Sequence, residues 1–247
     1  MMKVALVVGH TERRPGAAAV APISSPEYPW NKDFAERLIA LVASLGDAEA
    51  RAFFRDEVGL VGAYNAVKSW GADCAVELHF NAAGPSATGS ETLYVTAVSK
   101  QLAEAVQDAT VMTLGLRDRG VKTPREASGG RGQRNLSQMG PKPSILTEPF
   151  FGSNAGDARI ASERKFELIK AQAEAVVNVL KSVDAEDLWT VSANVLNVRG
   201  GPGVEFDKLA WGPLDRGATV EVVSRHGDWA MIQSDRGEGF VHTAFLA

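Results

Sequence analysis

Short apolar runs alternate with segments of helical periodicity over the first 183 residues of this 247-residue chain. The apolar or alternating runs have the length and β-branched content of strands, and they span 2–9, 50–54, 73–80, 89–96 and 144–151. Apolar side chains recur at helical spacing in 33–45, 59–70, 99–114 and 157–183. This interleaving predicts an α/β domain built around one sheet.

The pattern changes after Val183. A short polar joint, Asp184–Asp187, is followed by short β patterns that are separated by turn signals, and helical periodicity is absent there. Short strands at this spacing are typical of a small all-β barrel. We therefore predict a first domain over 1–183, a linker at 184–188 and a barrel over 189–247.

Composition excludes several classes of protein. The formal charge is −4, from 26 basic and 30 acidic residues, which argues against nucleic acid as a partner. The single cysteine, Cys74, lies in an apolar context and predicts a buried thiol. The first eight residues hold one Lys and too few apolar residues for a signal peptide, and no run reaches the ~18 apolar residues of a membrane span. We therefore expect a protein made in the cytoplasm without a signal peptide.

Residues 115–141 form a long Gly-rich and basic segment that predicts a loop. Loops of this length are commonly functional lids or disordered segments. A lid over a site and a plain solvated loop both remain open.

Three predicted strands end in groups that bind metals or transfer protons: His10, His79 and Glu148. A lone His at a strand end is more often a structural residue, but a second His of the same type favours a metal site. A catalytic zinc site takes about three N, O or S ligands, so a third ligand must come from an acid. Glu27 is the best candidate, because it lies in the predicted loop 11–31 after the first strand, and Glu12 is its nearest competitor.

Five short motifs fall in one order along residues 2–182: Val7-Val-Gly-His10, Glu27-x-x-x-Asn31, His79-x-Asn81-Ala, Gly89-Ser-Glu91 and Glu148-x-x-Phe151-x-Ser153-Asn154. In this order they resemble the zinc-dependent N-acetylmuramoyl-L-alanine amidases of the type-3 class. The resemblance implies a mixed, twisted sheet flanked by helices. It also implies a Zn²⁺ enzyme that cleaves the amide between the lactyl group of N-acetylmuramic acid and L-alanine in peptidoglycan.

Site roles follow from the resemblance residue by residue. His10, Glu27 and His79 would bind zinc, and Glu148 would be the general acid/base that acts on a zinc-bound water. Glu77 stands where the family usually has Ser; it shares a strand face with His79 and would orient that imidazole or add a carboxylate near the metal. Asn81 would contact substrate or end the strand as a turn residue, and Glu91 would steady the site from behind.

Other departures concern the first motif and the last. The opening Val-Val-Gly-His10-Thr replaces the usual Asp-Pro-Gly-His-Gly. Pro149, directly after Glu148, removes a backbone donor where the scissile carbonyl would be held.

Residues 189–247 resemble a bacterial Src-homology-3-type domain, the small barrel often attached to wall hydrolases. The matching segments are Leu196-Asn-Val-Arg199-Gly-Gly-Pro202-Gly203, Gly217–Val220, Gly227–Ile232 and Gly239–Leu246. The resemblance implies binding to the wall or its peptides. Trp211 and Trp229 offer flat apolar surface for such a ligand, although Trp229 is more readily explained as a core residue.

The predicted protein is thus a two-domain peptidoglycan amidase, and a wall hydrolase without a signal peptide suggests a phage or prophage endolysin. A bacterial autolysin without its leader is the alternative origin. Two rival functions remain open: a zinc peptidase or carboxypeptidase acting on stem peptides, and a non-catalytic wall-binding protein.

Overall fold

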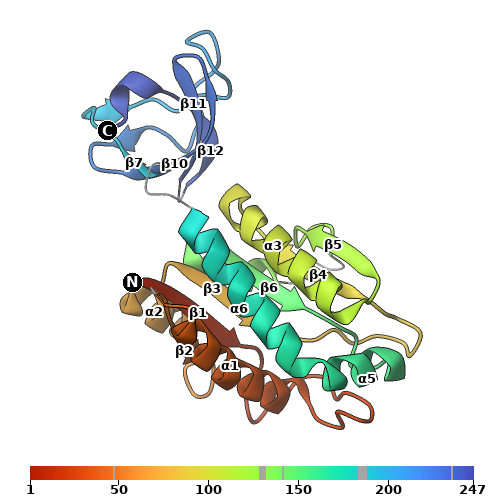
Figure 1. The fold of residues 1–247 in the computed structure, drawn as a ribbon. Coiled ribbons are helices and arrows are strands. Elements are labelled where there is room, and N and C mark those ends of the chain that lie inside the picture. Colours follow the sequence, from red (N-terminus) through yellow and green to blue (C-terminus); the bar gives the residue numbers. More distant parts are fainter. Residues whose placement is uncertain (47, 128–131, 141, 183–187, 235) are drawn as a thin grey trace. The chain divides into compact units, whose positions relative to one another are not determined.

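A six-stranded mixed sheet forms the centre of residues 1–180 in the computed structural model (Figure 1). Its strand order is β2-β1-β3-β6-β4-β5; β4 runs antiparallel to β6, and every other neighbouring pair is parallel. The strands are β1 Met2–Val8, β2 Ala48–Phe53, β3 Cys74–Leu78, β4 Ser90–Tyr94, β5 Asp118–Lys122 and β6 Ser144–Glu148. The predicted α/β class with a mixed sheet is confirmed.

Helices cover both faces of this sheet. They are α1 Glu27–Ser44, α2 Gly59–Trp70, α3 Ala97–Leu114, α4 Gln133–Leu136, α5 Ala155–Glu163 and α6 Lys165–Ser182, with a 3₁₀ turn at Ser137–Met139. α1, α3 and α6 lie along one face (Figure 1). On the other face, Tyr64 of α2 and Met139 of the 3₁₀ turn pack against Ala5 and Val7 of β1.

Strand direction brings several segments to one edge of the sheet. Because β1, β3 and β6 are parallel, their carboxyl ends meet at that edge. β4 begins there because it is antiparallel to β6, and β5 begins there because it is parallel to β4. The residues that follow β1, β3 and β6 therefore lie close in space to the first residues of β4 and β5.

Residues 1–46, 48–127, 132–140, 142–182, 188–234 and 236–247 are described by the structure. The described part of the chain divides into two compact units, Met1–Leu180 and Lys181–Ala247. Most of the predicted linker, residues 184–187, lies outside the described residues, and Leu188 opens the first strand of the second unit. Among the helices described, none has the length and apolar character needed to span a membrane.

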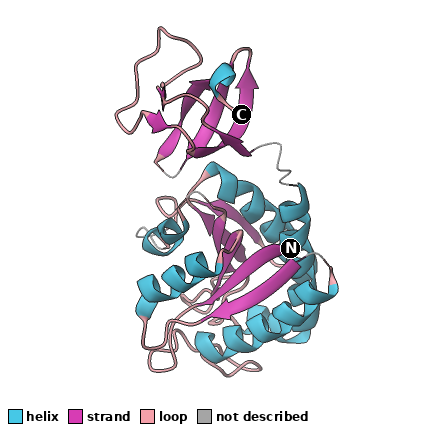
Figure 2. Cartoon of the chain, turned by 90° about the vertical axis from the view of Figure 1, so that its left-hand side faces the viewer, coloured by secondary structure: helices cyan, strands magenta, loops and turns pink. Residues whose placement is uncertain are grey.

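The second unit consists of short antiparallel strands (Figure 2). One sheet has the order β12-β11-β10-β7 and a smaller one pairs β8 with β9. These strands are β7 Leu188–Thr190, β8 Val195–Leu196, β9 Leu214–Asp215, β10 Thr219–His226, β11 Trp229–Ser234 and β12 Gly237–His242, followed by a 3₁₀ turn at Thr243–Phe245. Its core is aliphatic and includes Val198, Val220, Ala230, Ile232 and Val241.

The first helix begins earlier than its periodicity predicts. It starts at Glu27, directly after Pro26, and contains Pro29 in its first turn. Proline is tolerated there because the first helical N–H groups have no partner within the helix. The prediction that Glu27 lies in a loop was wrong, because the prolines were taken as loop signals.

Two other predicted segments differ from the structure. The segment 115–141 is not one loop: it contains β5, α4 and a 3₁₀ turn, while 128–131 and 141 lie outside the described residues. The predicted closing helix 157–183 is two helices that meet at Arg164. Asn154 caps the first of them, accepting hydrogen bonds from the backbone N–H groups of Gly156 and Asp157.

Asp157 ties the loop after β6 to the loop before β4. Its carboxylate is 2% exposed, and it accepts hydrogen bonds from the backbone N–H of Gly89 at 3.0 Å, the backbone N–H of Phe151 at 3.0 Å and the Thr88 hydroxyl at 2.6 Å. Three elements that border the same edge of the sheet thus share one buried acceptor.

Removal of this acceptor is expected to destabilise the first unit. Asp157→Ala leaves two buried backbone donors unpaired and should lower the free energy of unfolding by about 2–4 kcal/mol. Asp157→Asn keeps one oxygen for those donors and should cost clearly less. Urea unfolding followed by helical circular dichroism measures both, with Asp108→Ala on the exposed surface of α3 as the control. Equal losses for the Ala and Asn variants would contradict this account.

Candidate metal centre

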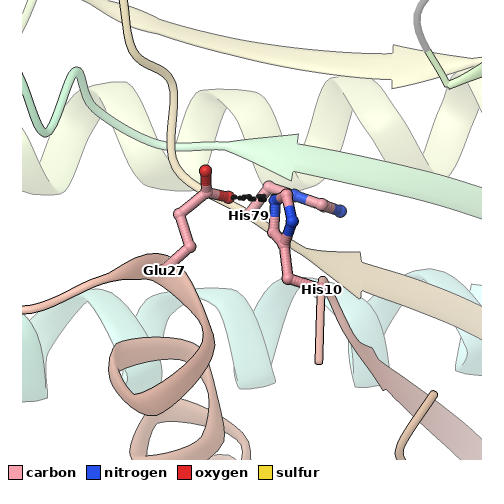
Figure 3. A group of neighbouring side chains, drawn as sticks. All are labelled: His10, Glu27 and His79. Atoms are coloured by element: carbon pink, nitrogen blue, oxygen red, sulfur yellow. Dashed lines mark hydrogen bonds and ion pairs between the residues drawn. The ribbon is translucent and has the colours of Figure 1, made fainter. Parts of the chain in front are cut away.

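His10, Glu27 and His79 converge on one point (Figure 3). One carboxylate oxygen of Glu27, Oε2, lies 3.1 Å from Nε2 of His10 and 3.0 Å from Nδ1 of His79. One donor atom from each of the three residues lies within 4.8 Å of the others. Two imidazole nitrogens and one carboxylate oxygen form a donor set that zinc commonly takes.

The strand ends explain why these residues meet. His79 directly follows β3, and its backbone N–H donates to the Thr147 carbonyl of β6 at 3.1 Å. His10 lies two residues after β1 with φ = 67°, a left-handed conformation that turns the chain at the edge of the sheet. Glu27 is the first residue of α1, and its Oε1 accepts the backbone N–H of Ala17 at 3.2 Å.

Gly9 lies against His79. A Cβ atom at Gly9 would be 2.4 Å from Cε1 of His79 and 2.6 Å from the carbonyl oxygen of Leu78. Neither distance is possible for a real side chain, and one of the two groups is backbone. Only glycine therefore allows β1 to end this close to the imidazole.

Glu27 is ionised at neutral pH. Burial opposes its ionisation, but hydrogen bonds from His10 and His79, together with their charge, outweigh burial and lower the pKa of Glu27 to about 2. A carboxylate must be deprotonated to bind a metal, so this environment suits a ligand.

Glu77 holds the other nitrogen of His79. This carboxylate is fully buried and lies 2.9 Å from Nε2 of His79. The carboxylates of Glu27 and Glu77 are both acceptors, so each ring nitrogen of His79 faces an acceptor in the metal-free chain; when a metal takes Nδ1, the Glu77 contact keeps the proton on Nε2. The contact is the one expected of a residue that orients the imidazole, and both roles given to Glu77 stay predictions.

Three further residues surround Glu77, and the sequence analysis missed them. The Tyr64 hydroxyl and the Asn135 amide each donate to Glu77 at 2.7 Å, and the Arg55 guanidinium forms an ion pair with it. They come from α2, from α4 and from the segment after β2. No periodicity or spacing in the sequence links these three residues to Glu77, so the sequence alone could not predict them as its partners.

Glu148 shares a cavity with the cluster. The cavity has a volume of about 280 Å³, and its walls include all three clustered residues, Asn81, Asn135 and Glu148. Glu148 ends β6 and is 4% exposed. The structure thus places the predicted ligands and the predicted acid/base on the walls of one small cavity.

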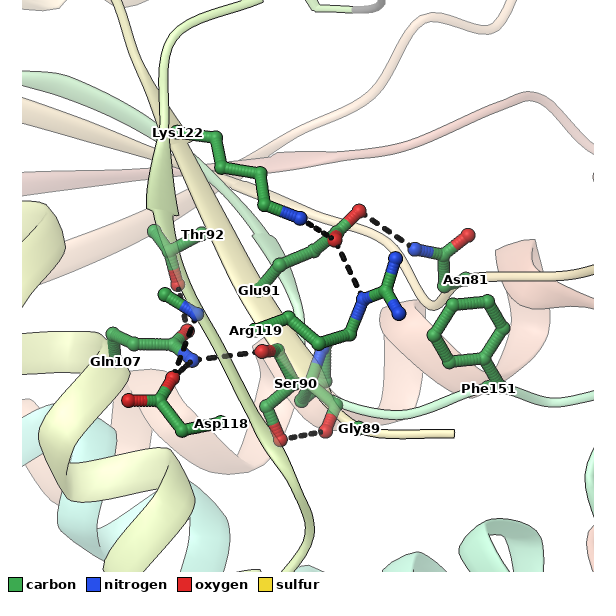
Figure 4. Close-up of polar contacts among 12 residues, drawn as sticks. Asn81, Gly89, Ser90, Glu91, Thr92, Gln107, Asp118, Arg119, Lys122 and Phe151 are labelled. Atoms are coloured by element: carbon green, nitrogen blue, oxygen red, sulfur yellow. Dashed lines mark hydrogen bonds and ion pairs between the residues drawn. The ribbon is translucent and has the colours of Figure 1, made fainter. Parts of the chain in front are cut away.

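Asn81 connects this cavity to a charged network (Figure 4). Its side-chain amide donates to Oε1 of Glu91 at 2.9 Å, while Arg119 Nε and Lys122 Nζ contact Oε2 of Glu91 at 2.8 and 2.7 Å. Burial raises the pKa of Glu91, but the bonds from Lys122 and Arg119 outweigh it and lower this pKa to about 2. Glu91 therefore contacts a residue of the cavity wall through Asn81.

The remaining candidates lie elsewhere. Glu12 is exposed and is not a member of the three-residue cluster. In the second unit, Trp211 is half-buried and packs against the core. Trp229 is half-buried as well rather than enclosed, and the centre of its ring lies 5.4 Å from that of His242.

Comparisons with known proteins identify both units. Residues 4–178 match the family described as N-acetylmuramoyl-L-alanine amidase, and residues 194–247 match the bacterial SH3 domain. N-acetylmuramoyl-L-alanine amidase LytC of Bacillus subtilis (strain 168) is 37% identical over 114 residues, which is 44% of this chain. The match spans only 21% of that relative's length.

Solved structures share the fold of the first unit. The catalytic domain of CwlV, an N-acetylmuramoyl-L-alanine amidase from Bacillus (Paenibacillus) polymyxa var. colistinus, superposes with a TM-score of 0.63 at 20% identity, covering 73% of this chain and 99% of that one. An N-acetylmuramoyl-L-alanine amidase from Clostridium difficile 630 gives 0.62 at 24% identity, covering 74% and 98%.

The close approach at Gly9 predicts a loss of metal binding when a side chain is added. Gly9→Ala should displace the His79 imidazole and weaken zinc binding by about tenfold or more. Competition with a chromophoric chelator measures the affinity. Gly84→Ala is the control, because a Cβ there meets nothing within 4 Å. Wild-type affinity in Gly9→Ala would show that the imidazole is not held by this contact.

The Glu91 network predicts a specific loss of stability in acid. The folded-state pKa is about 2, against an ordinary value of 4.5, so the contribution of Glu91 is complete above about pH 4.5 and fades as the pH falls toward 2. Glu91→Gln should therefore cost on the order of 2 kcal/mol at pH 7 and progressively less from pH 4.5 downward. Urea unfolding of the metal-free protein at several pH values tests this, with exposed Glu167→Gln as the control. A difference in unfolding free energy between wild type and Glu91→Gln that does not change with pH would refute this account.

Proposed function

This chain belongs to the N-acetylmuramoyl-L-alanine amidase family, and from that premise we propose that its first unit hydrolyses the amide between N-acetylmuramic acid and L-alanine in peptidoglycan, with zinc as its cofactor. The observation that carries the proposal is the placement of His10, Glu27 and His79 around one point in a cavity that also contains Glu148.

The residues fit zinc on chemical grounds. Glu27 is ionised, Glu77 keeps the proton of His79 on Nε2 when a metal takes Nδ1, and Nε2 of His10 faces the same carboxylate oxygen. Three protein ligands leave a position open, which distinguishes a catalytic zinc site from a structural one. When bound, zinc supplies polarisation of the amide carbonyl and a bound water of lowered pKa.

Glu148 is the proposed general acid/base. Its carboxylate takes a proton from the attacking water as the oxygen bonds to the lactyl carbonyl carbon. The C–N bond then breaks, and Glu148 returns the proton to the leaving nitrogen. The products are a free lactyl carboxylate on muramic acid and a peptide with an L-alanine amino terminus, so atoms and charge balance.

Other residues position the reacting groups. Glu77 fixes the orientation and protonation of His79, and Asn81 presents its amide on the cavity wall, where it can contact the substrate. The reaction needs one water at the metal and little other water around the substrate. A small cavity lined by Phe80 and Leu146 as well as by polar groups meets both needs.

The bacterial SH3 domain is proposed to bind peptidoglycan as well, with Trp211 and Trp229 as candidate contacts. Both rings are half-buried and keep part of their apolar surface accessible. The role of a phage or prophage endolysin stays a prediction.

Glu148→Gln should separate chemistry from metal binding. The amide keeps the shape of the side chain but cannot carry the proton, so hydrolysis of purified peptidoglycan should fall by about 10²–10⁴-fold while zinc content stays near one per chain. His79→Gln should lose both zinc and activity. Elemental analysis and turbidity loss measure the two effects, and exposed Glu167→Gln is the matched control.

Product analysis distinguishes the amidase from a stem peptidase. New amino termini should be L-alanine alone. Other new termini would favour the peptidase, and wild-type lysis by Glu148→Gln would remove Glu148 from the mechanism.

A further inference from the structure

Two cations lie on the same face of the sheet as Glu148, on the side away from the metal cluster. Glu91 of β4 pairs directly with Glu148 of β6, and Leu93 of β4 pairs with Lys122 of β5. Paired residues project to one face, and so do residues two apart in a strand, so Lys122 projects to the face of Glu148. The strands lie in the order β3-β6-β4-β5. The side chains follow the same order across the sheet: His79 comes first, then Glu148, then Glu91, and last the cations Arg119 and Lys122.

Arg119 has donors to spare. Its Nε donates to Glu91, and its guanidinium carbon lies 5.0 Å from the centre of the Phe151 ring, so the plane of the group is fixed by two contacts. The two terminal nitrogens have no hydrogen-bond partner among the described residues, and the side chain is 30% exposed. In Figure 4 these nitrogens point toward Asn81, which lines the cavity.

The charge of this cluster favours an anion. Arg119 and Lys122 together carry two positive charges, and both contact the same oxygen of Glu91, which carries one negative charge. A guanidinium with a free terminal edge binds carboxylates in a bidentate manner.

We propose that Arg119, supported by Lys122, binds a free carboxylate of the peptide stem, that of the second residue from the scissile amide. This inference rests on the proposed amidase function and adds a substrate-binding subsite to it. The free carboxylate at this position belongs to an acidic residue that is linked onward through its side chain.

Strand spacing supports the choice of the second residue. Neighbouring strands lie about 4.8 Å apart, so β4, which carries Glu91, lies about 10 Å from β3, which leads to His79. Two residues of extended peptide span about 7 Å, and the remaining distance is about one hydrogen bond from a guanidinium to its ligand. A carboxylate one residue closer would fall short, and the terminal carboxylate of a longer stem would pass beyond Arg119.

Three synthetic muramoyl-peptides test the subsite with the wild-type chain. One has the second-residue carboxylate free, one has it as the amide, and one has it free but carries an amidated carboxyl terminus. The expected result is a fall in kcat/KM of about tenfold or more, chiefly through KM, for the second peptide only. Equal kcat/KM on the first two peptides would overturn the proposal. A fall in kcat/KM on the third peptide, which lacks the free terminal carboxylate, would overturn it as well.

A variant then assigns the effect to Arg119. Arg119→Met should make the rates on the free-carboxylate peptide and on the amide equal, so discrimination disappears. Arg117→Met, at an exposed neighbour, should keep wild-type discrimination. Equal losses on both peptides would mean a structural role and would overturn the subsite. If no muramoyl-alanine bond is cleaved in any peptide by the zinc-loaded wild type, the amidase proposal itself fails, which is a different result from cleavage without discrimination.

Discussion

One carboxylate oxygen organises the first unit. Oε2 of Glu27 lies within 3.1 Å of both imidazoles, and these three residues come from the segment after β1, from the start of α1 and from the residue after β3. Such convergence requires β1 and β3 to be parallel neighbours, Gly9 to lack a side chain, and α1 to begin at Glu27 itself. A shift of β1 against β3 by one residue would move a donor atom by about 3.3 Å, more than the length of a metal–ligand bond.

A second carboxylate, Glu91, divides the site into two electrostatic regions. Like charges directly across a pair of strands repel, and Glu91 faces Glu148 in the register of β4 and β6. Arg119 and Lys122 offset the charge of Glu91 from the far side, so the cavity near Glu148 does not carry two uncompensated carboxylates. The cluster of His10, Glu27 and His79 and the cation pair thus lie on opposite sides of Glu148 along the sheet.

The sequence predicted the parts of this arrangement that are encoded locally. The runs ending at His10, His79 and Glu148 are strands because their apolar side chains are buried on both faces, and ordered motifs indicated which ends belong together. The start of α1 was missed because proline marks a loop and a helix N-terminus equally well. β5 was missed because its five residues, Asp118–Lys122, are polar or half-exposed; edge strands need little apolar character. Arg55, Tyr64 and Asn135 were missed because their common partner, Glu77, is visible only in three dimensions.

Glu77 shows what a fully buried charge beside an imidazole requires. A buried carboxylate would be strongly destabilising at this position without partners. Here Arg55 supplies the opposite charge, and Tyr64 and Asn135 supply hydrogen bonds, so each of three elements outside β3 has a residue committed to one side chain. Because the same carboxylate holds Nε2 of His79, the orientation of this imidazole depends on α2 and α4 as well as on its own strand. Asn135 also lines the cavity, so the cavity wall and the His79 imidazole share one buried partner.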